Sequence, residues 1–150
     1  MSFSLPNKSV LGLATASTTN GATATALFDT LGFNTCTINV NMTTADSTTN
    51  KLTTLKISES DDTVVTNFVD ITAFVGGTNT GNFTLPAPST TTNQPNLYKF
   101  NIDLRGRKRY LKVTATPPTT QSITVWADLH KPQQSPVTAA AAGAVAVVEG

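Results

Sequence analysis

The 150-residue sequence contains little charge, one cysteine and one histidine. Charged residues make up 13% of the chain and the formal net charge is +1, so no overall electrostatic field attracts the protein to nucleic acid or to a membrane surface. A single cysteine excludes a disulfide within the chain. One cysteine and one histidine also exclude an ordinary structural zinc site built by one chain.

Patterns that carry catalysis are also scarce. The one histidine, His130, falls at the end of a predicted strand, where exposure to solvent is the simple interpretation. No glycine-rich phosphate loop follows a strand, and no Gly-Lys-Ser/Thr motif occurs. Glu59, Asp61 and Asp62 stand close together, but the central glycine and final glutamate of a calcium-binding loop are missing. We therefore expect no enzyme activity, no cofactor and no bound metal.

The sequence also shows no targeting pattern. Residues 1–17 lack the charged start and the continuous apolar run of a secretory signal. The longest apolar run, residues 139–148, is too short to span a bilayer. The expectation is a soluble protein that is made in the cytoplasm and has no membrane partner.

Threonine is the abundant residue, at 29 of 150 positions. Its branched Cβ suits a pleated strand better than a helix, and the scarcity of Glu, Gln, Lys and Arg argues against a helical protein. Apolar residues alternate with polar ones in short segments bounded by turn residues, which is the pattern of half-buried strands. We predict eight strands, at residues 22–29, 34–42, 51–58, 64–68, 69–75, 97–104, 109–116 and 122–130.

The alternation also predicts which side chains are buried. In residues 34–42 one face consists of Cys36, Ile38, Val40 and Met42. Cys36 is therefore predicted to be a buried thiol instead of a reactive one. Trp126 falls on the face opposite Ile123 and Val125, where it either covers a second apolar layer or offers a stacking platform for a sugar.

These strands predict an all-β fold with one domain. Two antiparallel sheets packed face to face would give each strand its one apolar face, and about eight strands suit a jelly-roll-like β-sandwich. The sequence leaves the order of the strands open. We assign residues 1–20 to an extended N-terminal arm, residues 21–131 to the sandwich and residues 132–150 to an extended C-terminal arm.

Positive charge is concentrated at one turn, between the predicted strands 97–104 and 109–116. All three arginines of the chain lie there, together with two lysines: Arg105, Arg107, Lys108, Arg109 and Lys112. Three interpretations compete: pairing with carboxylates across a subunit interface, a solvated hairpin turn, and binding of nucleic acid phosphates. The interface is favoured over nucleic acid, because the nearby aromatic residues have core spacing and no basic stripe continues elsewhere.

Three segments resemble a group of small structural proteins found among the head genes of tailed bacteriophages. They are KLTTLKISESDD at residues 51–62, FVDI at residues 68–71 and DLRGRKRYLKV at residues 103–113. In that group an ESDD turn precedes a strand, and a G-x-K-R-Y-x-(K/R) hairpin returns toward the end. The resemblance covers roughly residues 25–132 and does not extend to the two arms.

The resemblance implies a virion protein, namely a capsid decoration or cement protein with a β-sandwich or jelly-roll fold, often trimeric. The implied partners are the major capsid protein of a phage head and further copies of the chain in a homotrimer. The implied location is the capsid surface of the virion. Two other functions stay open: a phage tail or host-attachment module that binds glycan, and a single jelly-roll shell protein.

The C-terminal arm is small, apolar and almost uncharged, with the sequence SPVTAAAAGAVAVVEG at residues 135–150. Disordered tails usually avoid such runs of alanine and valine. We predict that this arm becomes ordered against a neighbouring subunit or the capsid, the alternative being a frayed tail. The candidate contact residues are Arg105, Arg107, Lys108, Arg109, Lys112, Val145, Val147 and Val148.

Overall fold

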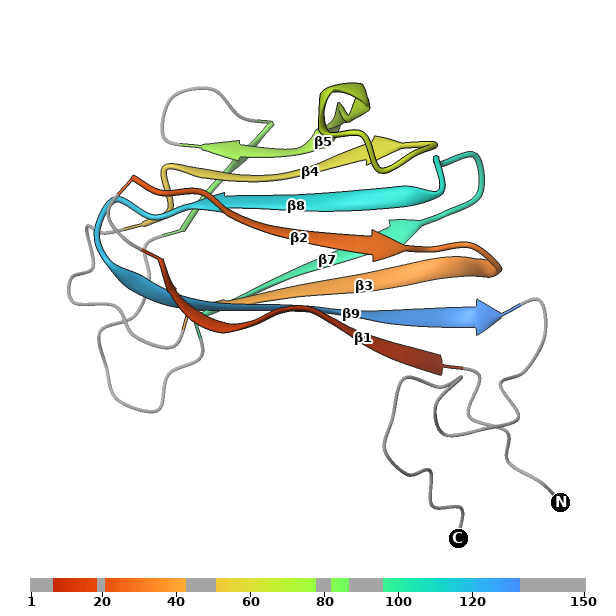
Figure 1. Ribbon diagram of the computed structural model, residues 1–150, viewed down its shortest axis with the longest axis horizontal. Coiled ribbons are helices and arrows are strands. Elements are labelled where there is room, and N and C mark those ends of the chain that lie inside the picture. Colours follow the sequence, from red (N-terminus) through yellow and green to blue (C-terminus); the bar gives the residue numbers. More distant parts are fainter. Residues whose placement is uncertain (1–6, 19–20, 43–50, 78–81, 87–95, 133–150) are drawn as a thin grey trace, which may run out of the picture.

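The computed structural model describes residues 7–18, 21–42, 51–77, 82–86 and 96–132, with the side chains of residues 15–18 left aside. These residues form two β-sheets that lie face to face (Figure 1), so the predicted all-β sandwich is confirmed. The elements are β1 (Asn7–Thr18), β2 (Ala24–Asp29), β3 (Phe33–Met42), β4 (Thr54–Ser60), the 3-10 turn η1 (Val65–Asn67), β5 (Val69–Gly77), β6 (Phe83–Thr84), β7 (Leu97–Asp103), β8 (Tyr110–Thr116) and β9 (Gln121–Pro132).

Strand pairing establishes the order that the sequence left open. The first sheet has the order β1-β9-β3-β7, and the second has the order β2-β8-β4-β5-β6. All pairs are antiparallel except β5 and β6, which are parallel. The orders β1-β9-β3-β7 and β2-β8-β4-β5 are the two four-stranded halves of a jelly roll, to which the two-residue strand β6 is an addition.

The core lies between the two sheets and follows the predicted alternation. Along β9 every second side chain is buried, and the predicted inward face of β3 is buried as well. Burial of each such apolar side chain stabilises the fold by about 1.5–3 kcal/mol. The largest fully buried apolar side chains are Phe28, Ile38, Met42, Leu52, Leu55, Ile57, Leu85, Leu111, Ile123 and Leu129.

The N-terminal arm needs a correction, because β1 belongs to the sandwich. It pairs with β9 from Asn7 to Thr18, so the domain begins before residue 21. Two register irregularities, between Leu11 and Leu13 and between Leu13 and Ala16, break the period of two that identifies a strand in a sequence. Only residues 1–6 and 19–20 of the assigned arm lie outside the described residues.

At the other end of the domain, β9 extends to Pro132, the first residue assigned to the C-terminal arm. Residues 133–150 lie outside the described residues, and with them the candidate contacts Val145, Val147 and Val148. Their predicted role therefore stays a prediction.

One predicted strand, residues 64–68, is wrong. The structure has the 3-10 turn η1 there, between β4 and β5. The carboxylate of Asp62 accepts hydrogen bonds from the Val64 amide, at 2.9 Å, and from Asn67 Nδ2, at 2.8 Å. Local hydrogen bonds between side chain and backbone, such as the one from the Val64 amide, compete with the hydrogen bonds that would pair this segment with another strand. The jelly roll still has eight principal strands, because β1 takes the place of the strand expected at 64–68.

Candidate functional site

The segments that carry the resemblance meet at one end of the second sheet, where the β7–β8 connection lies beside the β4–β5 connection (Figure 1). The β7–β8 connection is not the predicted hairpin, because β7 belongs to the first sheet and β8 to the second. Arg107 Nη1 lies 3.3 Å from Glu59 Oε1, and the Lys108 amide donates to Glu59 Oε2 at 3.2 Å. Lys108 Nζ is 3.7 Å from Asp61 Oδ2. Residues that are far apart in the sequence thus form one network, which we call the charged end.

Arg109 ties the start of β8 to the β2–β3 turn. Its guanidinium forms a fork on Asp29, with Nε 3.0 Å from Oδ1 and Nη2 2.7 Å from Oδ2. The hydrogen bond from Arg109 lowers the pKa of Asp29 below its ordinary value. The amide and the hydroxyl of Thr30 both donate to the Arg109 carbonyl, at 3.0 and 2.7 Å. A bidentate pair with these extra bonds holds the two turns in one relative position.

The other two of the five basic residues also have partners within the chain. Arg105 pairs with Asp103 in its own turn, with Nη2 2.7 Å from Oδ2. Lys112 Nζ lies 4.4 Å from the centre of the Phe68 ring, which is a cation–π contact. The structure therefore brings the five predicted basic residues together and gives each one an intramolecular partner. Pairing across a subunit interface is not needed to explain the cluster. That these five basic residues contact another protein stays a prediction.

The charged end also presents exposed apolar side chains that the sequence reading missed. Val64, Val65 and Val69 are 54%, 73% and 61% exposed. We call residues 64–69 the valine loop. Leu31, 65% exposed, lies in the β2–β3 turn that Arg109 holds at the same end. Apolar side chains surrounded by polar and charged groups are typical of protein interaction sites.

A sequence signal for the valine loop does exist. If residues 64–68 formed a strand, the consecutive valines Val64 and Val65 would point to opposite faces of the sheet, because successive side chains alternate. Only one of them could then face the core. They also follow Asp61 and Asp62, and aspartate favours turns by bonding to the backbone two residues on. Together these features indicate an exposed loop more than a buried strand.

Acid is expected to weaken the charged end. The hydrogen bond from Asn67 lowers the pKa of Asp62, and Arg105 lowers the pKa of Asp103 to about 2. Such carboxyl groups bind fewer protons in the folded than in the unfolded chain. Their contribution to stability is therefore complete above the unfolded pKa and is lost as the pH falls through the folded pKa. We expect the melting temperature to decrease between about pH 4 and about pH 2.

Thermal unfolding of the full chain and of Asp62→Asn across this pH range checks the prediction. The variant has one fewer titrating carboxylate, so its melting temperature should decrease less than that of the parent as the pH falls. Equal pH dependence of the two proteins would contradict the role given to Asp62.

The outer face of the first sheet carries polar side chains, and several of them form hydrogen bonds with one another. Asp128 accepts from Ser9 Oγ at 2.7 Å and from Asn39 Nδ2 at 3.1 Å. His130 Nδ1 lies 2.8 Å from Asn7 Oδ1. Trp126 is half-buried on this face, as the alternation predicted, in the strand register between Leu11 and Asn39. Whether it covers an apolar layer or offers a platform stays open.

Cys36 is buried, as predicted, and burial raises the pKa of its thiol to about 12. A thiol with so high a pKa has almost no reactive thiolate at neutral pH. Within the described ranges, no group of three or more His, Cys, Asp or Glu side chains is placed to hold a metal ion. The same part of the chain contains no helix that is long and apolar enough to cross a membrane.

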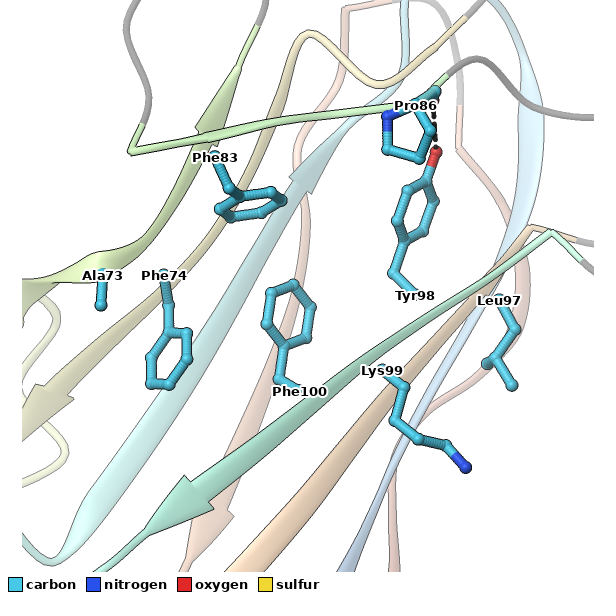
Figure 2. Close-up of a pocket in the computed structure, with 8 residues that line it drawn as sticks. All are labelled: Ala73, Phe74, Phe83, Pro86, Leu97, Tyr98, Lys99 and Phe100. Atoms are coloured by element: carbon cyan, nitrogen blue, oxygen red, sulfur yellow. Dashed lines mark hydrogen bonds between the residues drawn. The ribbon is translucent and has the colours of Figure 1, made fainter.

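A second apolar feature opens along one side of the sandwich, where β5 and β6 of the second sheet face β7 of the first (Figure 2). We call this hollow the seam. Its volume is about 400 Å³. The Phe100 ring stands edge-on to Phe74 and Phe83, with ring centres 5.9 and 5.8 Å apart. Tyr98 donates its hydroxyl hydrogen to the Pro86 carbonyl at 3.3 Å. The seam is therefore an aromatic hollow with a fixed wall.

Comparisons with known proteins show no relatives by sequence: no family model matches the chain, and no curated protein matches it. Among solved structures, the chain is similar to part of a family GH115 4-O-methyl-α-glucuronidase with specificity for decorated arabinogalactans. The TM-score is 0.39 and the identity 12%, over 83% of this chain and 16% of that one. A likeness this low carries no information on function. The fold and its surfaces define a jelly-roll β-sandwich with a charged end and an aromatic seam.

Proposed function

We propose that the protein is a non-enzymatic virion structural protein, a cement or decoration protein that binds the outside of a phage capsid. One observation supports this most directly: the segments that resemble phage head proteins converge at the charged end, which presents the exposed valine loop. The jelly roll is also a fold of viral capsid domains, although it serves lectins as well. The partners are the major capsid protein and further copies of the chain in a homotrimer.

The geometry suggests how such a contact works. The valine loop is held by hydrogen bonds from the Val64 amide and Asn67 to the Asp62 carboxylate, and by the contact of Lys112 with the Phe68 ring. A preformed loop loses little conformational freedom on binding, so more of its apolar burial is available as affinity. A symmetric shell repeats the same contact many times, and copies joined to one another gain further by avidity. A small apolar patch on each copy is then sufficient for stable attachment.

The triple variant Val64→Ser, Val65→Ser and Val69→Ser tests the proposal. All three side chains are exposed, so the variant should fold like the parent. Burial of one valine contributes about 1.5–3 kcal/mol, and 1.4 kcal/mol corresponds to a tenfold change in affinity. We therefore expect attachment to fall by about tenfold or more. Cosedimentation of the purified protein with empty capsids measures it.

The matched control is Leu11→Ser. Leu11 is also exposed, and it lies in β1, which pairs with β9 of the first sheet and contributes no residue to the charged end. The control should attach like the parent. Unchanged attachment of the valine variant, or an equal loss in the control, would argue against the valine loop as the contact. A parent protein that binds no capsid would remove the proposed function itself.

A glycan-binding tail or host-attachment module is the second candidate, favoured by half-buried Trp126 on a polar sheet face with Asp128 and Asn39. An indole beside hydrogen-bonding groups matches the amphipathic character of a sugar. A glycan array with the purified protein separates this candidate from the first. The number of copies in each particle separates an accessory protein from a principal jelly-roll shell protein.

A further inference from the structure

The outer face of the second sheet continues the valine loop toward β2. Lys112 of β8 points away from the core, since its neighbours Leu111 and Val113 are buried. Its Nζ lies 4.4 Å from the centre of the Phe68 ring in the valine loop. On the other side of Lys112 lies Leu27 of β2, its partner in the strand register. Directly opposite residues of an antiparallel pair have Cβ atoms about 4.5–5.5 Å apart, so Leu27, Lys112 and the valine loop form one surface.

This surface, which we call the outer patch, is apolar around one cation. Leu27 is exposed, as are the three valines of the valine loop. Lys112 forms no ion pair with a carboxylate in the described ranges of the chain. The stem of a lysine covers apolar surface while its ammonium group stays in water. The outer patch therefore offers apolar burial together with one positive charge that the chain does not neutralise.

We propose that the whole outer patch docks on the capsid and that Lys112 receives a carboxylate of the shell protein, with Leu27 and the valine loop making apolar contacts on either side. The inference rests on the proposed cement function and states what the partner must present: an acidic side chain set between apolar ones. The ammonium group has three donors, so it can pair with a carboxylate while it keeps its contact with the Phe68 ring.

The charge of the outer patch favours a protein surface over other partners. Nucleic acid and anionic bilayers bind through several basic groups acting together, and the outer patch has one. A two-fold contact between copies would set the patch against itself and bring two Lys112 side chains together, which is unfavourable. An apolar protein surface that carries one carboxylate complements the patch in both shape of contact and charge.

Cysteine footprinting with full-length chains tests the extent of the docking surface. Leu27→Cys and Val65→Cys place thiols on the two apolar sides of the outer patch, and Leu11→Cys is the matched control, exposed on β1 of the first sheet. The native Cys36 is buried and does not interfere. With an excess of empty capsids, a maleimide should label the two patch cysteines several times more slowly than without capsids. The control should be labelled at the same rate in both conditions.

Substitutions of Lys112 test the role of its charge. Lys112→Glu should reduce cosedimentation with empty capsids several-fold, because it sets a negative charge against the partner's carboxylate. Lys112→Arg keeps the positive charge and the stacking on Phe68, so it should attach like the parent. Lys99→Glu makes the same change of charge at an exposed position in β7 of the first sheet and should also attach like the parent. Equal losses for Lys112→Glu and Lys99→Glu would overturn the role given to Lys112.

The footprint separates this inference from the proposed function. Protection of both patch cysteines by capsids supports the inference. Protection of Val65→Cys alone overturns it and leaves the cement function, with the valine loop as the contact. A parent protein that does not cosediment with capsids removes the cement function and the inference together. Protection that needs only a higher protein concentration, double-stranded DNA or phosphatidylserine vesicles also overturns it, in favour of a second copy, nucleic acid or a membrane.

Discussion

Replacing Gly12 with valine is expected to lower the free energy of unfolding by about 3 kcal/mol, although the residue lies in an edge strand. Gly12 stands at the first irregularity of β1, where its backbone lies against the second sheet. A Cβ at this position would be 2.6 Å from Phe28 Cε1 and 2.9 Å from Ala26 Cβ. Phe28 is fully buried, so its ring has no space into which to move. Denaturant unfolding of the purified variant measures the loss.

The control for Gly12→Val is Ala14→Val in the same strand. Ala14 is exposed, and valine suits a strand at least as well as alanine does, so the change should stay within about 0.5 kcal/mol. Equal stability of the Gly12 variant and the parent would show that β1 does not pack on β2 at this point. The N-terminal segment would then be an arm, as the sequence suggested, and not a jelly-roll strand.

The contrast between β1 and β9 shows what the sequence can predict. In β9 the alternation of Ile123, Val125, Ala127 and Leu129 is unbroken, and all four are buried. A strand between two neighbours in a sheet must keep one face on the core throughout, which imposes a period of two. Strand β1 lies at the edge and contains two irregularities. Its pattern has no constant period, so sequence reasoning assigned it to an arm.

The charged end was predictable only in part. The basic residues are adjacent in the sequence, and their clustering needs no fold. Their partners are distant: Arg109 lies 80 residues from Asp29, and Arg107 lies 48 residues from Glu59. Those pairs depend on β8 lying between β2 and β4, an order that composition and spacing do not encode. The sequence predicted carboxylate partners across an interface, and the fold supplies carboxylate partners within the chain.

The seam could not be predicted from the sequence, for a similar reason. It joins β5 and β6 of one sheet to β7 of the other. Phe74, Phe83 and Phe100 are separated by stretches without strand pattern, and nothing local indicates that their rings meet. Strand β6 has only two residues, too few for any alternation to appear.

Replacing Gly76 with valine is expected to displace Phe83 and lower the free energy of unfolding by about 2 kcal/mol. The Phe83 ring lies over Gly76, where a Cβ would be 2.8 Å from both Cε1 and Cε2. The displaced ring would lose its edge contact with Phe100, worth about 0.5–1.5 kcal/mol, together with part of its burial. Hydrogen exchange should accelerate where β5 pairs with β6, at Gly76–Phe83 and Gly77–Thr84, and stay unchanged between β3 and β9.

A double-mutant cycle with Phe83→Ala isolates the cause. Phe83→Ala removes the ring and leaves Gly76 in place, so it loses the same aromatic contact without inserting a side chain. If the ring alone excludes valine at position 76, adding Gly76→Val to Phe83→Ala should cost almost nothing, and the two effects should be strongly non-additive. Additive losses would mean that valine at position 76 disturbs the β5 backbone itself. The seam would then owe its shape to the strand and not to the ring that rests on the glycine.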